Sequence, residues 1–66
     1  MSGEPAERIR TLLLRTDNLL KKGRADRALE ALEEARGVAA EPAVDERLRE
    51  LVDRRIEALR SLGGPE

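Results

Sequence analysis

Residues 23 to 35 of this chain read Gly23-Arg24-Ala25-Asp26-Arg27-Ala28-Leu29-Glu30-Ala31-Leu32-Glu33-Glu34-Ala35, and this stretch decides the fold. A single glycine is followed mostly by alanine, leucine, glutamate and arginine, which are strong helix formers, without a β-branched residue or a proline. Gly23 can adopt the left-handed conformation that ends one helix just before another begins. The sequence therefore predicts a turn followed by a helix over residues 24 to 39. Its apolar face is expected to consist of Ala25, Ala28, Leu29, Leu32, Ala35 and Ala39.

The residues before the glycine predict a first helix over residues 5 to 22. Pro5 suits the first helical turn, because its φ is already helical and its missing N–H would have no partner there. The expected buried stripe consists of Ile9, Leu12, Leu13, Thr16, Leu19 and Leu20. Leu14 does not fit this stripe. Because alanines allow two helix axes to approach closely, the first two helices should form an antiparallel hairpin.

A third helix is expected over residues 42 to 62, starting at Pro42 and ending before two glycines. Its heptad seam would be Val44, Leu48, Leu51, Arg55, Ala58 and Leu62, flanked by Val52, Ile56 and Leu59. Arg55 interrupts the seam. Either its charge extends into water from an apolar stem, or it pairs with an acid and sets the specificity of an interface. Residues 1 to 66 thus predict one all-α domain, a three-helix antiparallel bundle.

The composition disfavours catalysis and several kinds of partner. The chain has no His, Cys or Tyr, which supply many catalytic groups and metal ligands, so we expect no enzyme and no metal or cofactor. The net charge of −1 and the absence of aromatic residues disfavour binding to nucleic acid. Apolar runs are too short for a membrane span or a signal peptide, so we expect a cytoplasmic protein that does not bind membranes.

Residues 9 to 42 resemble one tetratricopeptide repeat, a helix-turn-helix unit of about 34 residues. The match is clearest from Gly23 to Ala35. Within it, Ala28 and Ala35 occupy the small positions of the family and Leu32 occupies its large apolar position. The resemblance implies a helical hairpin in which the third helix, over residues 42 to 62, acts as a capping helix.

The first helix departs further from the family. Leu12 and Leu19 replace its tryptophan and tyrosine, and Arg15 and Thr16 replace its usual leucine and glycine. The family binds extended peptides or helices on a concave surface lined by the first helix of each repeat. The positions here that match this surface are Arg10, Leu13, Asp17, Leu20 and Lys21. The paired lysines and asparagines of family members that clamp a terminal carboxylate are missing, so the resemblance implies an apolar or mixed groove.

These features favour a protein-protein interaction or assembly module. Repeat units of this kind do not bury their apolar faces alone, so the first helix is expected to bind a peptide or helix of a partner, or a second copy in a homodimer. Leu14 is either an ordinary exposed leucine or part of this contact together with Leu13 or Leu20. Two alternatives remain: an end cap or spacer of a longer helical array, and a small docking or inhibitory domain of an enzyme complex.

Overall fold

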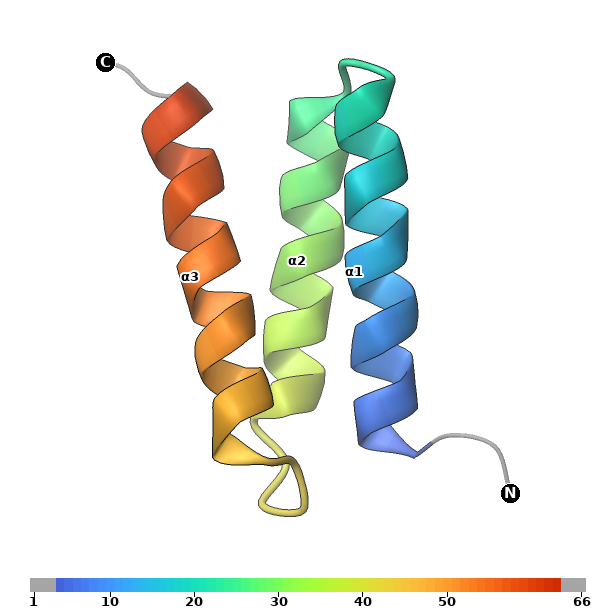
Figure 1. Ribbon diagram of the computed structural model, residues 1–66, viewed down its shortest axis with the longest axis vertical. Helices are drawn as coiled ribbons and strands as arrows, with labels where there is room; N and C mark the ends of the chain where they lie inside the picture. The colour runs from blue at the N-terminus through green and yellow to red at the C-terminus, as the bar shows by residue number, and fades with distance from the viewer. Residues whose placement is uncertain (1–3, 64–66) are drawn as a thin grey trace.

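Three helices make up the computed structural model, which describes residues 4–63 and their side chains as far as Ser61. They are α1 (Pro5–Lys21), α2 (Ala25–Ala39) and α3 (Glu46–Gly63). No strand occurs between residues 4 and 63. The helix α2 lies between the other two and runs antiparallel to both (Figure 1). The expected all-α, three-helix antiparallel bundle is therefore confirmed.

The helices do not all pack equally. The backbones of α1 and α2 lie close together along their length, those of α2 and α3 pack less extensively, and α1 hardly touches α3. Figure 1 shows the reason, since α2 lies between α1 and α3. Every helix therefore depends on α2 for its buried contacts.

The turn between α1 and α2 has the geometry that the sequence predicts. Gly23 has a φ of +75°, in the left-handed region. Its N–H donates to the Leu20 carbonyl at 3.0 Å, and the Arg24 N–H donates to the Leu19 carbonyl at 2.9 Å. This pair of hydrogen bonds satisfies carbonyls that the end of α1 leaves without helical partners.

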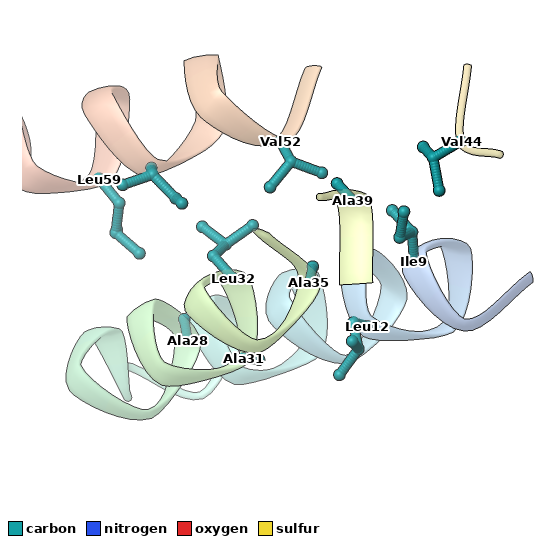
Figure 2. Close-up of a cluster of buried hydrophobic side chains, with 11 residues drawn as sticks. Ile9, Leu12, Ala28, Ala31, Leu32, Ala35, Ala39, Val44, Val52 and Leu59 are labelled. Carbon is teal, nitrogen blue, oxygen red and sulfur yellow. The ribbon is translucent and has the colours of Figure 1, made fainter. Parts of the chain in front are cut away.

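The buried face of α2 is wider than expected and slightly rotated. Ala28, Leu32, Ala35 and Ala39 are buried as expected. Ala31 is buried as well, whereas Ala25, expected on the face, is exposed. The difference arises because α2 is covered on two sides rather than one. Figure 2 shows Leu32 reaching from α2 toward Val52 and Leu59 of α3.

Two expectations for α3 are wrong, and the first concerns its start. The helix begins at Glu46 rather than at Pro42. The Val44 N–H donates to the Glu41 carbonyl at 3.0 Å, which forms a turn around Pro42. The Asp45 carboxylate then accepts a hydrogen bond from the Arg47 N–H at 3.2 Å, as a helix N-cap does. The turn brings Val44 into the core with Ile9 and Ala39 (Figure 2).

The second wrong expectation concerns the buried face of α3. Val52, Ile56 and Leu59, expected only to flank the seam, are the residues that α3 buries. Leu51 is 38% exposed and Ala58 is exposed, so this part of the seam is not buried; the Leu62 side chain lies outside the described residues. The reason is that α3 packs mainly on α2, which leaves the rest of its apolar surface open.

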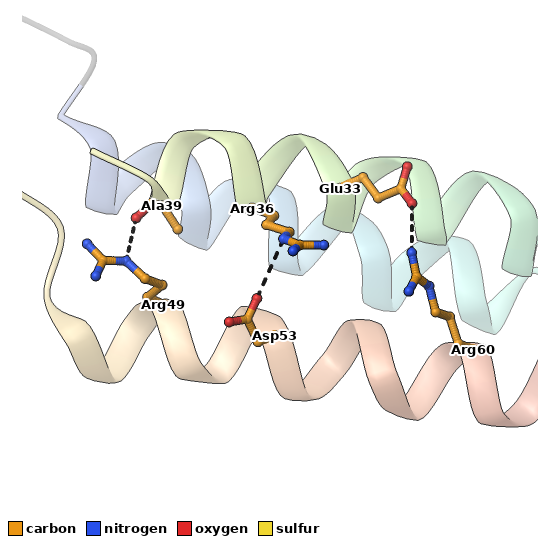
Figure 3. Close-up of polar contacts among 6 residues, drawn as sticks. All are labelled: Glu33, Arg36, Ala39, Arg49, Asp53 and Arg60. Atoms are coloured by element: carbon orange, nitrogen blue, oxygen red, sulfur yellow. Dashed lines mark hydrogen bonds and ion pairs between the residues drawn. The ribbon is translucent and has the colours of Figure 1, made fainter. Parts of the chain in front are cut away.

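Arg49 joins the start of α3 to the end of α2. Its Nε donates to the Ala39 carbonyl at 2.8 Å and its Nη2 donates to the Glu41 carbonyl at 3.2 Å. A cation here satisfies the last carbonyl of α2 and one carbonyl of the turn that follows, and it stabilises the negative end of the helix dipole. Figure 3 shows two weaker ion pairs further along the same helices, Arg36–Asp53 at 3.9 Å and Arg60–Glu33 at 3.7 Å.

Substitution of Gly23 by alanine is expected to lower the free energy of unfolding by about 1 kcal/mol, because a Cβ is strained at positive φ. No neighbour would meet that Cβ, so the effect would come from the backbone alone. Gly37 is the matched control, since it lies within α2 with equally open space around it. Gly37→Ala should raise stability by about 0.5 kcal/mol. Urea unfolding followed by circular dichroism measures both; changes of the same sign would contradict the role given to Gly23.

Substitution of Arg49 by methionine keeps the length and apolar stem of the side chain but removes both hydrogen bonds. We expect a loss of about 1 kcal/mol in the free energy of unfolding, since hydrogen bonds from charged groups contribute about 1.5–3 kcal/mol and Arg49 is only half-buried. Arg47→Met is the control, because Arg47 is exposed on the same helix. Equal melting temperatures for the two variants would show that Arg49 does not tie α3 to α2.

Candidate docking groove

A groove of about 360 Å³ lies between α1 and α3. Its volume is at the lower end of the ~300–1,000 Å³ that is common for ligand sites. Leu32 of α2 is buried beneath it, with side chains of α1 on one side and of α3 on the other. The lining residues are Thr16, Leu20, Leu32, Arg54, Arg55, Ala58 and Leu59. Most of these surfaces are aliphatic, and the charges come from α3.

The groove exists because α2 holds α1 and α3 apart, and two of the lining side chains, those of Thr16 and Ala58, are too short to fill the space. Ala58 contributes only a methyl group from α3. Thr16 is buried in α1, and its Oγ1 donates to the Leu12 carbonyl at 2.8 Å. The Thr16 hydroxyl is therefore satisfied within its own helix and needs no ligand.

An ion pair joins the two sides of the groove. Nη1 of Arg55 lies 3.0 Å from Oδ1 of Asp17, linking α3 to α1. The two side chains are 40% and 48% exposed, so water screens the pair in part. Of the two expected roles of Arg55, the structure thus shows pairing with an acid, and the acid belongs to the same chain.

The structure brings some of the expected partner-binding residues together and separates others. Leu20 and Arg55 line the groove, and Asp17 contacts Arg55. Leu13 is half-buried and packs against the core, which leaves little of it for a partner. Leu14 is 65% exposed but is not among the lining residues. The remaining two, Arg10 and Lys21, are exposed on α1.

Of the α3 residues at this site, only Arg55 was expected from the sequence to have a role in binding. The heptad spacing places Arg55 and Ala58 on one face of α3, but spacing within one helix does not determine which other helix that face meets. Arg54 carries no sequence signal that distinguishes it from the other surface arginines. The most buried lining residues, Leu32 and Thr16, were expected only in the core, and Leu59 was expected only to flank the seam.

The described part of the chain has no metal-binding cluster, no unpaired buried polar side chain and no membrane-spanning helix. Between residues 4 and 63, no group of acidic side chains is placed to hold a metal ion. Within the same residues, every buried side-chain nitrogen or oxygen has a hydrogen-bond partner. None of the helices described is long and apolar enough to cross a membrane. A second hollow, of about 330 Å³ between α1 and α2, is lined mainly by the charged side chains Arg15, Arg27, Glu30 and Glu34, so the mostly aliphatic groove is the stronger candidate for docking.

Comparison of the chain with models of known protein families, with curated protein sequences and with solved structures gives no significant match. Its function is accordingly inferred from its own residues and their geometry.

A double-mutant cycle on Asp17→Ala and Arg55→Ala is expected to give a coupling energy of about 0.5 kcal/mol, typical of a half-exposed ion pair. The coupling should decrease as salt is added. The pair Arg36–Asp53 is the matched control, because it is longer, at 3.9 Å, and both side chains are more exposed. A larger coupling for the control pair than for Asp17 and Arg55 would contradict a specific link across the groove.

Proposed function

We propose that this chain is a non-catalytic protein-protein interaction module that docks a segment of a partner protein in the groove between α1 and α3. The observation that carries the proposal is the aliphatic groove with Leu20, 40% exposed, at its edge. Leu51, at 38% exposure, extends the apolar surface along α3. Exposed apolar surface with a polar rim is typical of protein interaction sites.

The resemblance to a tetratricopeptide repeat supports this proposal. A repeat followed by a capping helix would place α1 and α3 on the same surface, with α2 behind them. The family binds peptides or helices on the surface lined by the first helix of its repeats. Leu20 and Asp17, which match positions on that surface, lie at the groove.

A partner protein is favoured over a second copy by the charges on α1. Arg10 and Lys21 lie one turn before and two turns after Leu14 on the same face of the helix, and all three residues are exposed. Two copies that met through this face would bring like charges together. Like charges across an interface are destabilising.

A second candidate function, an end cap of a longer helical array, is favoured by the outer face of α3. Its exposed residues include Arg47, Glu50, Glu57 and Ser61. Terminal repeats need such a polar face, because no further repeat covers them. In that arrangement a preceding helix would cover the far side of α1, where Leu14 is exposed.

Substitutions at Leu20 and Leu14 distinguish the two candidate functions, docking in the groove and capping a helical array. Panning a random peptide library against the folded chain is expected to select binding peptides. Leu20→Glu should weaken their binding at least about tenfold, because it puts a charge at an apolar contact. Leu14→Glu is the matched control on the same helix and should change affinity less than about twofold.

The outcomes are distinct. Failure to select any peptide, or selection of peptides that bind Leu20→Glu as well as the unaltered chain, would overturn docking in the groove. If only Leu14→Glu lost peptide binding, the binding surface would be the far side of α1, which would favour the end-cap function. Sedimentation of the free chain tests the second copy, since a mass that rises with concentration and falls in Leu14→Glu would support self-association instead.

A further inference from the structure

The charges around the groove are unbalanced. Two guanidinium groups line it, those of Arg54 and Arg55. One carboxylate, that of Asp17, is bonded to Arg55 at 3.0 Å. Arg54 is exposed and makes no ion pair with any residue from 4 to 63. One positive charge at the groove is thus left without a partner.

Two further basic residues lie at the end of α1, next to the groove residue Leu20. Lys21 and Lys22 follow Leu20 directly, and both are exposed. They more than offset the partial negative charge at the end of α1. The chain as a whole has a net charge of −1, so this positive region is local. Acidic residues gather elsewhere, for example Glu33 and Glu34, which pair with arginines away from the groove.

We infer that the segment docked in this groove is acidic and carries a leucine-like side chain, so that an aliphatic group fills the space over Leu32 while a carboxylate pairs with Arg54. This inference rests on the proposed function. The planar guanidinium presents N–H groups in a geometry that matches a carboxylate. The aliphatic walls, Leu20 and Leu59, supply the apolar contact.

Asp17 has a particular effect in this arrangement. Its carboxylate repels an acidic ligand and also occupies Arg55, which otherwise would be a second donor for the ligand. Removal of the Asp17 charge should therefore strengthen binding, although it removes an ion pair from the fold. A residue with a purely structural role would not produce such opposite effects.

The test uses peptides selected from the random library on the full chain and then synthesised with a fluorescent label. The selected peptides are expected to combine acidic residues with leucine, isoleucine or valine. Fluorescence anisotropy should show that Arg54→Glu lowers the affinity of the chain for these peptides about fivefold or more. Asp17→Asn should raise that affinity about threefold. Arg47→Glu is the matched control, an equal charge change on the exposed face of the same helix, and should have less than about a twofold effect.

A charge swap makes the test specific. When the acidic residue of a selected peptide is replaced by lysine, binding to the unaltered chain should fall, and binding to Arg54→Glu should recover. If the selected peptides were neutral or basic but still needed Leu20 for binding, the inference of an acidic ligand would be wrong. The proposal of docking in the groove would still hold. Equal effects of Arg54→Glu and Arg47→Glu would show only general charge attraction and would also overturn the inference. Failure to select any peptide would overturn the groove itself.

Discussion

Ala28 and Ala35 present only methyl groups to the rest of the bundle, and both are fully buried. Their small size lets α1 approach the axis of α2 closely, where dispersion contacts are most numerous. The other helix, α3, packs on the adjacent side of α2 through Leu32. Since α1 and α3 hardly touch, neither has another surface on which to bury its apolar face. The whole arrangement therefore depends on close packing against α2.

The same constraint produces the groove. A closed bundle would bury the stripe of α3 that contains Leu51 and Ala58 against α1, but the central position of α2 keeps those two helices apart. What crosses the gap is the half-exposed ion pair between Asp17 and Arg55. Such a pair contributes little stability, so it does not draw α1 and α3 together. The apolar surface that is left open is the surface available to a partner.

A core with few large side chains makes the ends of the helices important. Aliphatic residues of moderate size and alanines make up the buried cluster, and a chain of 66 residues buries a modest share of its surface. Two local features at helix ends add stability that this small core does not supply. Gly23 ends α1 without strain, and Arg49 satisfies the carbonyl of Ala39, the last residue of α2. Each gives a hydrogen-bond partner to backbone groups that a helix end leaves unpaired.

Local features were predictable from the sequence because they depend on neighbours along the chain. The helix propensities, the apolar spacing and the left-handed Gly23 determined three helices, the turn between α1 and α2, and most of the buried residues of α1 and α2. The start of α3 was misplaced by four residues, because Pro42 fits a tight turn as well as a first helical turn.

The tertiary structure alone decided which face of α3 is buried and where the site lies. Helical spacing defines a stripe but not the helix that the stripe meets, so the exposure of Leu51 and the pairing of Arg55 with Asp17 depended on the position of α2. Arg49 and Arg54 look alike in the sequence, but one bonds a helix end and the other lines the groove. The sequence by itself thus determined the helices and their pairing as a hairpin. Which surfaces remained open was set by packing between residues distant in the chain.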